Sequence, residues 1–512
     1  MIRPTPVVLT IVSGFGMSPV LQGNAIKAAR LPVFSHLIET YPAMTLHASG
    51  AFVGLEDNAC GSSRAGCLTI GAGRPVLAPC TRLHDAATAR AFGKVPALRR
   101  AGEHAQTHTG AVHLIGQFDG QSDRVHAILS ALLTAAQDWN VTRVFLHVIL
   151  SDDITTSDQV RECVALIASH VKTAGIGKIA SISGSFFAGD TRHEWERVKL
   201  AYDAMANGTP VGVPGSDSDD HHAVAGVLPC SIDGERIRPG DACIFFDQDP
   251  RQIRELVTAF ALPTFNAFTR TYIPNLRIVT LVETDVDLPI ETAFPTTLVE
   301  HTMGTALSDA GLRQLRIAET EGFVSVTAGL NGGISASPGE DRLIIPSPTV
   351  SRVERVPEMS SVTVADRVVK EIAYGRYDVI IAYLPAPDRV AQSGDETATI
   401  KACEAVDRAI GRIAEATLAL DGILLLTSDH GNAEAINDRV KSVDGEITGT
   451  CHPVPFVVVG RAHEGLKARF GDLIGGDLSL STPSGTLADI APTMLGMLNV
   501  PIPKEMTGTS LV

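Results

Sequence analysis

The sequence contains no run of basic residues long enough to form a positively charged stripe. Its 42 Lys and Arg residues are outnumbered by 57 Asp and Glu residues, which gives a formal net charge of −15 at pH 7. A surface of this charge repels phosphate backbones on average. We therefore expect no nucleic-acid partner.

Membrane-spanning runs and clustered cysteines are absent as well. Near the N-terminus, the apolar run at residues 7–12 stops at Ser13, far short of a signal sequence or a membrane span. The eight cysteines are scattered over 512 residues without paired spacing, which argues against a disulfide framework and favours reduced thiols. These observations predict a cytoplasmic protein with no membrane partner, whose cysteines mostly fill small spaces in the core.

The composition is that of a globular chain with enough material for more than one core. Apolar residues make up 45% and charged residues 19%, a balance that excludes disordered and fibrous classes. No repeat of fixed period is visible in the sequence. Because a single hydrophobic core stops growing well below 512 residues, we expect at least two domains.

Short apolar runs recur along the chain, and each is followed by turn residues and then by a helical pattern. One such helix is expected over residues 400–418, where apolar residues repeat at helical spacing. This alternation is typical of parallel sheets covered by helices, so the predicted fold class is α/β. The runs are residues 7–12, 112–115, 144–150, 179–182, 244–246, 379–384, 423–426 and 456–459.

Functional side chains are expected in the turns after these strands, because the carboxyl ends of parallel strands gather at one edge of a sheet. Asp429 and His430 follow the run at 423–426 and together offer a carboxylate oxygen and an imidazole to a divalent cation. Asp388, after the run at 379–384, is a second candidate ligand. The alternative interpretations are a helix-capping Asp with an incidental His beside it, and a turn aspartate next to a proline.

A glycine-flanked loop at residues 61–66 carries the candidate nucleophile. Ser63 lies there among residues that permit tight turns, as a nucleophile at the start of a helix requires. A helix-capping serine is an equally common interpretation. The neighbouring Arg64 is able to hold an anion, although a single arginine is more often a solvated surface group.

Many short blocks along the whole chain stand in the order found in one enzyme family. They include Gly23-Asn24-Ala25-Ile26, Gly71-Ala72-Gly73-Arg74, Trp195-Glu196-Arg197-Val198, Asn331-Gly332-Gly333, Pro357-Glu358-Met359-Ser360, Asp429-His430-Gly431-Asn432-Ala433-Glu434 and Asp489-Ile490-Ala491-Pro492-Thr493. In these blocks the chain resembles the cofactor-independent (2,3-bisphosphoglycerate-independent) phosphoglycerate mutases of the alkaline phosphatase superfamily.

The resemblance implies a domain organisation. It predicts an alkaline-phosphatase-like three-layer domain with a second α/β domain inserted into it. By this analogy, residues 1–76 and 297–512 form the phosphatase-like domain, which holds the metal and phosphoserine site, and residues 77–296 form the substrate-binding domain with its hinges. A monomer is expected on the same ground.

The resemblance also implies a chemistry. Members of the family use manganese and a serine to move a phosphoryl group between the 3- and 2-hydroxyls of phosphoglycerate, a step of glycolysis. Ser63 matches that serine, and Asp429, His430 and Asp388 match three metal ligands. The implied ligand is therefore a phosphorylated or carboxylated small molecule.

Other metal-binding positions of the family carry different residues here. Ser13 stands where the family has an aspartate ligand, and Gln392 stands where it has a histidine ligand. The last histidine ligand of the family falls on Gly449, although His452 is close enough in the chain to take its place if the loop shifts. These changes predict weaker metal binding, with one manganese ion or none.

The substrate-binding positions have also lost positive charge. Ser185 and Thr191 stand where the family has arginines, and Gly322 stands where it has a lysine. A phosphoester that is buried without charge-assisted donors has unpaired oxygens, and each missing donor forfeits about 1.5–3 kcal/mol. No substrate-binding residue is therefore assigned from the sequence.

These departures lead to three hypotheses. The first is a family member with lost or strongly reduced mutase activity that retains the fold as a binding or regulatory protein. The second is a metal-dependent phosphoryl-transfer enzyme or phosphatase that acts on another substrate through Ser63, with zinc favoured over manganese if Cys67 and Cys451 contribute. The third is an ordinary mutase whose second-domain loops have been misaligned, which the replacements at Ser13 and Gly322 argue against.

Overall fold

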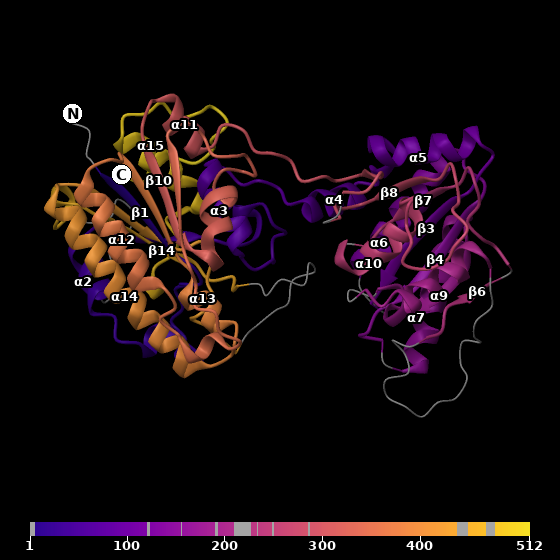
Figure 1. Ribbon diagram of the computed structural model, residues 1–512, viewed down its shortest axis with the longest axis horizontal. Coiled ribbons are helices and arrows are strands. Elements are labelled where there is room, and N and C mark those ends of the chain that lie inside the picture. The colour runs from indigo at the N-terminus through magenta and orange to yellow at the C-terminus, as the bar shows by residue number, and fades with distance from the viewer. Residues whose placement is uncertain are drawn as a thin grey trace. The chain divides into compact units, whose positions relative to one another are not determined.

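The chain folds into two compact units, one comprising Met1–Ala78 and Thr297–Val512 and the other comprising Pro79–Thr296. The computed structural model describes the chain from residue 6 onward, with gaps at residues 120–122, 155, 190–192, 209–226, 233, 248–249, 285–286, 438–448 and 467–476. Each unit has its own sheet and its own hydrophobic core (Figure 1). No helix in the described part of the chain is both long and apolar enough to span a membrane.

In the described residues, the first unit is built on an eight-stranded sheet of order β11-β10-β12-β1-β13-β14-β2-β15. Neighbouring strands run parallel, except that β14 is antiparallel to both β13 and β2. The strands are β1 (Val7–Val12), β2 (Ala43–His47), β10 (Gln314–Glu319), β11 (Glu340–Ile345), β12 (Val379–Leu384), β13 (Ile423–Thr427), β14 (Val454–Val459) and β15 (Gly485–Thr486).

Helices cover both faces of this sheet and complete three layers (Figure 1). Successive side chains of a strand point to opposite faces. In β1, Val8 and Val12 pack against one helical layer, and Val7, Leu9 and Ile11 pack against the other. The first layer contains α1 (Ala25–Ala28), α2 (Pro32–Thr40), α12 (Ser361–Tyr374), α13 (Ala386–Ala391) and α14 (Glu396–Ala419), and the second contains α3 (Ser63–Ala72), α11 (Met303–Asp309) and α15 (Ile490–Met497).

The second unit has a seven-stranded sheet of order β6-β5-β4-β3-β7-β8-β9 in the residues that the structure describes. Its neighbouring strands run parallel, except that β6 is antiparallel to β5. The strands are β3 (Val112–Phe118), β4 (Val144–Leu150), β5 (Lys178–Gly184), β6 (Cys230–Ser231), β7 (Ala242–Phe245), β8 (Arg277–Thr280) and β9 (Glu291–Thr292).

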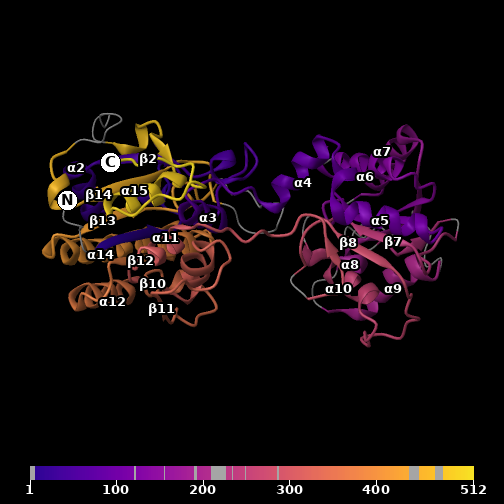
Figure 2. The same ribbon diagram turned by 90° about the horizontal axis from the view of Figure 1, so that it is seen from above.

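Helices again cover both faces of the second sheet (Figure 2). One face packs against α4 (Pro79–Thr88), α5 (Pro96–Thr107), α6 (Asp123–Asp138) and α7 (Ser157–Ala174). The other face packs against α8 (Ser185–Ala188), α9 (Trp195–Ala206) and α10 (Pro250–Ala261). The predicted fold class, a three-layer α/β domain with a second α/β domain inserted, is thus confirmed.

A buried chain of polar side chains runs from Asp241, just before β7, across strands β3, β4 and β5 of the second sheet. Asp241 Oδ2 lies 3.1 Å from His113 Nε2, His113 Nδ1 lies 2.9 Å from His147 Nε2, and His147 Nδ1 lies 2.7 Å from Ser181 Oγ. Burial lowers the pKa of both histidines. With each neutral ring carrying its proton on Nε2, every nitrogen in the chain has a partner of the right kind, so these polar groups are buried without an unpaired atom.

The eight apolar runs predicted to be strands all overlap strands of the structure, and residues 400–418 lie within α14. The prediction of parallel sheets fails at one run, because residues 456–459 belong to the antiparallel strand β14. Apolar patterning did not predict β10 and β11, since charged residues such as Arg316 and Arg342 interrupt it. Arg316 is nevertheless fully buried, with its guanidinium bonded to Gln314 Oε1 at 2.8 Å.

Candidate functional site

The carboxyl ends of β1, β12 and β13 meet at one edge of the first sheet, as the parallel topology requires. Ser13 directly follows β1, Asp388 lies in α13 just after β12, and Asp429 and His430 follow β13. A bridge between Gly14 and Gly431 ties the first and third of these turns together. The topology thus gathers residues that are hundreds of positions apart in the chain.

Helix α3 delivers Ser63 to this edge. Its N-cap is Ser62, whose Oγ accepts a hydrogen bond from the backbone N–H of Ala65 at 3.3 Å. The capping role proposed as an alternative for Ser63 therefore belongs to its neighbour, and the Ser63 hydroxyl is left to face the site. Gly66 lets the helix approach closely, because a Cβ at this position would lie 2.0 Å from the carbonyl oxygen of Asp429.

Ser63 and His430 form a hydroxyl–imidazole pair. Ser63 Oγ lies 3.0 Å from His430 Nε2, and His430 Nδ1 lies 2.9 Å from the carbonyl oxygen of Gly431. Since a carbonyl oxygen only accepts, Nδ1 carries the proton, and Nε2 accepts from the Ser63 hydroxyl. Burial lowers the pKa of His430, but the nearby carboxylates of Asp429 and Asp388 outweigh it and raise the pKa overall.

Asp429 is a fully buried carboxylate at the centre of the site. Its Oδ1 accepts from the backbone N–H of His430 at 3.0 Å. Its Oδ2 accepts from the hydroxyl of Tyr383 at 2.6 Å, from the hydroxyl of Ser13 at 3.2 Å and from the thiol of Cys67 at 3.7 Å. We call Ser13, Ser63, Tyr383, Asp429 and His430 the Ser63 cluster.

Tyr383 is the member of the Ser63 cluster that sequence reasoning missed. Its hydroxyl oxygen lies 2.8 Å from Ser13 Oγ and 3.2 Å from Ser63 Oγ, in addition to its bond to Asp429. Burial, followed by the charge of Asp429, raises the pKa of this phenol well above its ordinary value. The only signal in the sequence was a tyrosine near the end of an otherwise aliphatic strand.

Asp388, the second predicted ligand from a strand end, lies beside the Ser63 cluster. Its Oδ1 is 3.8 Å from His430 Nε2, and the Oδ1 of Asp429 is 3.7 Å from the same nitrogen. Both Asp388 oxygens accept from side-chain amides, Oδ1 from Asn432 at 2.7 Å and Oδ2 from Gln392 at 2.8 Å. Burial raises the pKa of Asp388.

The position of the last predicted histidine ligand has no space for a side chain. A Cβ at Gly449 would lie 2.4 Å from His430 Nδ1 and 2.1 Å from the carbonyl oxygen of Gly431. His452, the candidate replacement, instead places its Nδ1 3.1 Å from Glu434 Oε1. Glu434 is buried and also accepts from the backbone N–H of Gly16 at 3.1 Å.

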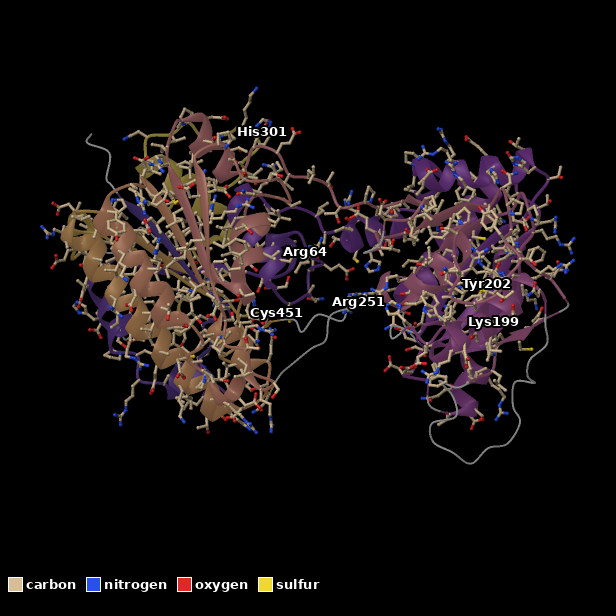
Figure 3. All side chains as sticks on the ribbon, viewed as in Figure 1. Arg64, Lys199, Tyr202, Arg251, His301 and Cys451 are labelled. Atoms are coloured by element: carbon tan, nitrogen blue, oxygen red, sulfur yellow. The ribbon has the colours of Figure 1, made fainter. Side chains whose placement is uncertain are left out.

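The two cysteines considered for zinc lie in different surroundings. Cys67 is buried against Asp429, and burial raises the pKa of its thiol well above the ordinary value. Cys451 is exposed, and its Sγ lies 2.8 Å from Cys60 Sγ. Cys451 and the exposed Arg64 both lie at the surface of the first unit (Figure 3).

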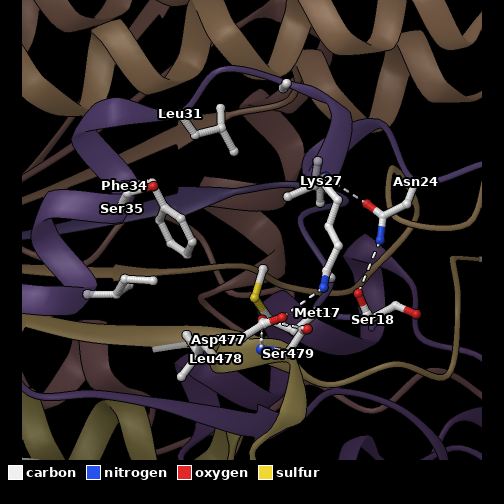
Figure 4. Close-up of a pocket in the computed structure, with 14 residues that line it drawn as sticks. Met17, Ser18, Asn24, Lys27, Leu31, Phe34, Ser35, Asp477, Leu478 and Ser479 are labelled. Carbon is white, nitrogen blue, oxygen red and sulfur yellow. Dashed lines mark hydrogen bonds and ion pairs between the residues drawn. The ribbon is translucent and has the colours of Figure 1, made fainter. Parts of the chain in front are cut away.

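A cavity of about 310 Å³ lies beside the loop that follows β1 (Figure 4). Its wall combines apolar side chains such as Phe34 with Lys27, whose Nζ is 2.8 Å from Asp477 Oδ2. Asn24 caps α1 here by accepting from the backbone N–H of Lys27 at 2.9 Å. The charge of the lysine is therefore compensated by a carboxylate within the wall of the cavity.

Comparisons with known proteins agree on one family. The family model of the Metalloenzyme superfamily matches residues 5–502. A 2,3-bisphosphoglycerate-independent phosphoglycerate mutase of Synechococcus sp. is 36% identical over 99% of this chain and 96% of its own length. That of Clostridium perfringens is 35% identical over 99% of each chain. The chain belongs to the 2,3-bisphosphoglycerate-independent phosphoglycerate mutase family.

A solved structure supports the fold of this mutase-family protein. The phosphoglycerate mutase of Leishmania mexicana superposes with a TM-score of 0.67 and 22% identity, over 99% of this chain and 97% of that one. The sequence matches confirm the expected family and superfamily. Membership of a metalloenzyme superfamily implies dependence on a metal ion.

The residues of this site do not fit the implied metal. The Tyr383 hydroxyl already bonds to Asp429 and lies within 3.2 Å of the Ser13 and Ser63 hydroxyls, and Asp388 is satisfied by two amides. In the described part of the chain, no group of three or more His, Cys, Asp and Glu side chains is arranged to hold a metal ion.

Replacing Gly322 with alanine should destabilise the protein. Gly322 is buried, and a Cβ there would lie 2.3 Å from Tyr383 Cδ1, so the ring or the backbone has to move. We expect Gly322→Ala to lower the free energy of unfolding by roughly 1–3 kcal/mol in chemical denaturation.

The matched control is Gly496→Ala in α15. This glycine is exposed, and the nearest atom to its added Cβ is Ser510 Oγ at 3.9 Å. Alanine at such a helical position is expected to be neutral or to stabilise by about 0.5–1 kcal/mol. Equal stability of the two variants would contradict the packing of the Tyr383 ring on Gly322.

Proposed function

We propose that this protein has lost, or has only strongly reduced, the family activity that converts 3-phosphoglycerate to 2-phosphoglycerate through a phosphoserine. The observation that carries the proposal is the engagement of Asp388. Its two oxygens accept from the neutral amides of Asn432 and Gln392 at 2.7 and 2.8 Å. Gln392 stands where the family resemblance places a histidine ligand. An amide pairs with a carboxylate but supplies no positive charge to a phosphoryl group.

The charge of the site supports the same proposal. Asp388, Asp429 and Glu434 are buried carboxylates, with the imidazole of His430 near the first two and that of His452 beside Glu434. A phosphoryl group would bring further negative charge to these carboxylates. Such charge must be stabilised in the transition state for transfer to proceed.

The second unit supports the proposal independently. We assign residues 77–296 as the substrate-binding domain and residues 1–76 with 297–512 as the phosphatase-like domain. Just after β5, Ser185, which stands where the family resemblance places an arginine, donates its hydroxyl to the Asp152 carboxylate and supplies no positive charge. Thr191, the other replaced arginine, lies outside the described residues.

Other properties in this proposal come from family resemblance. The metal would be one manganese ion or none, with zinc as the alternative. The ligand would be a phosphorylated or carboxylated small molecule, and the protein a cytoplasmic monomer derived from a glycolytic enzyme.

A mutase assay tests the main proposal. With 3-phosphoglycerate and saturating manganese, we expect kcat/KM to be at least about 10³-fold below that of the Clostridium perfringens relative measured in parallel. The reason is that compensating positive charge is missing both beside Asp388 and at Ser185 in the second unit. Turnover within about tenfold of that enzyme would refute the loss of mutase activity.

A second candidate function is an enzyme that acts on another substrate through Ser63. The observation that favours it is the 3.0 Å contact between Ser63 Oγ and His430 Nε2, the geometry of a nucleophile and its base.

Paired serine variants test this second candidate. For any phosphate or carboxylate ester that the protein turns over in a substrate panel, Ser63→Ala should lower kcat by about 10³-fold or more. Ser62→Ala removes only the helix cap and should lower the free energy of unfolding by about 1 kcal/mol while leaving kcat within a few fold. Equal losses in both variants would exclude Ser63 as the nucleophile.

A further inference from the structure

The hydroxyl of Tyr383 occupies the centre of the Ser63 cluster. It lies 2.6 Å from Asp429 Oδ2, 2.8 Å from Ser13 Oγ and 3.2 Å from Ser63 Oγ. A divalent cation bound by these three oxygens would need to approach each to about 2.0–2.2 Å. The phenol oxygen already lies within hydrogen-bond distance of all three of these oxygens, so it competes with a cation for them.

The fold builds Tyr383 into this position. Its strand β12 pairs in parallel with β1, with Tyr383 opposite Ile11, so the backbone of Tyr383 is fixed within the sheet. Its ring passes over Gly322, where even a single methyl group would collide with it. The loss of a side chain at Gly322 and the presence of a large ring at Tyr383 are thus two parts of one packing arrangement.

The donors around Asp429 supply what a buried carboxylate needs. Its two oxygens accept bonds from a phenol, a serine hydroxyl, a thiol and a backbone amide, with the phenol bond the shortest. Charge-assisted bonds of this kind offset the cost of removing a carboxylate from water. The site is therefore complete as a hydrogen-bonded network of protein groups.

We propose that Tyr383 takes the place of a cation in this site, and that Ser63 is a metal-independent nucleophile with His430 as its base. This goes beyond the loss of mutase activity, since a protein without that turnover could still bind a metal ion. It also gives the second candidate function its chemical class. The surrounding carboxylates disfavour anions, so the expected electrophile is an uncharged ester.

The proposed step involves only groups of this chain and the electrophile. The Ser63 oxygen attacks the electrophilic carbon or phosphorus as its proton passes to His430 Nε2. The bond to the leaving group then breaks, and for an alcohol the proton returns to the departing oxygen. With a carboxylic ester, water would release the acid and restore the Ser63 hydroxyl by the same route.

Metal titration tests the role of Tyr383. The unchanged protein should retain no stoichiometric manganese or zinc after dialysis, whereas Tyr383→Asn, which removes the ring, should bind manganese at least tenfold more tightly in calorimetry. One tightly bound ion per molecule of the unchanged protein would overturn the proposal even if the variant fails to fold. The mutase assay is independent of this result, so the two proposals can fail separately.

A neutral fluorophosphonate probe tests the role of Ser63. In the presence of EDTA we expect it to label Ser63 with loss of fluoride, at a rate that added manganese changes by less than twofold. Peptide mass spectrometry should locate the label, and His430→Gln should slow labelling at least a hundredfold while Ser62→Ala labels normally. The proposal of metal-independent activation would be overturned if labelling required manganese, or if the probe did not label Ser63.

A separate observation concerns the thiols of Cys60 and Cys451. Their sulfur atoms lie 2.8 Å apart, although 391 positions separate them in the chain. The two loops that carry them are already joined by backbone bonds, from Gly61 N–H to Thr450 O at 3.2 Å and from Gly449 N–H to Gly61 O at 2.9 Å. A disulfide here would need little movement of either loop.

We infer that Cys60 and Cys451 form an oxidisable pair beside the Ser63 cluster. Burial, and then its neighbour Cys451, raises the pKa of Cys60 to about 12, so the exposed Cys451 is the thiol that reacts first. A peroxide oxidises it to a sulfenic acid with release of water. Cys60 then attacks that sulfur, and a second water leaves as the disulfide forms.

Peptide mapping under non-reducing conditions tests this pair. Stoichiometric hydrogen peroxide should link the peptides containing Cys60 and Cys451, and a reductant should reverse the link. Cys451→Ser should abolish it, whereas Cys163→Ser, at a buried cysteine, should not. Absence of the link in the unchanged protein, or pairing with other cysteines, would overturn the inference.

Discussion

The buried carboxylate of Asp429 is the constraint around which the candidate site is arranged. It is fully removed from solvent, and such a charge is stable only when donors surround it. In this chain the phenol of Tyr383, the hydroxyl of Ser13 and the backbone N–H of His430 provide them. The family is one of metalloenzymes, so the same demand for positive partners is met here by hydrogen bonds.

This substitution of donors has consequences for the packing nearby. The ring of Tyr383 needs the empty space at Gly322, and the close approach of residue 449 to His430 leaves room only for glycine. Gln392 and Asn432 complete the shell of Asp388 with neutral amides. The replacements at Gly322, Gln392 and Gly449, which look unrelated in the sequence, therefore belong to one set of contacts around the site.

The pairing of Ser63 with His430 depends on the same arrangement. The turn after β13 fixes the imidazole through its bond to the carbonyl oxygen of Gly431, which leaves Nε2 free to accept from the serine. Helix α3 holds Ser63 in place because Ser62, not Ser63, caps the helix. The site thus holds a serine and an imidazole in the geometry of a nucleophile and its base, next to the buried carboxylates of Asp388 and Asp429.

The sequence alone determined much of the fold and the identity of the strand-end residues. Apolar runs indicate strands that are buried on both faces, and parallel strands bring their ends together, so Asp388, Asp429 and His430 could be proposed as neighbours. Ser63 was proposed from its glycine-flanked loop and from the family resemblance. Patterns of apolar residues could not reveal β10 and β11, whose charged side chains find partners only in the folded protein.

Only the tertiary structure decided what these neighbours do to one another. Tyr383 belongs to an apolar run in the sequence. Its hydroxyl reaches Ser13 and Asp429 only because β12 lies beside β1 in the sheet. The contact of its ring with Gly322 and that of Gly449 with His430 join residues from different segments. Hydrogen-bond geometry and steric exclusion depend on distances in space, and a linear pattern of residue types carries no such distances.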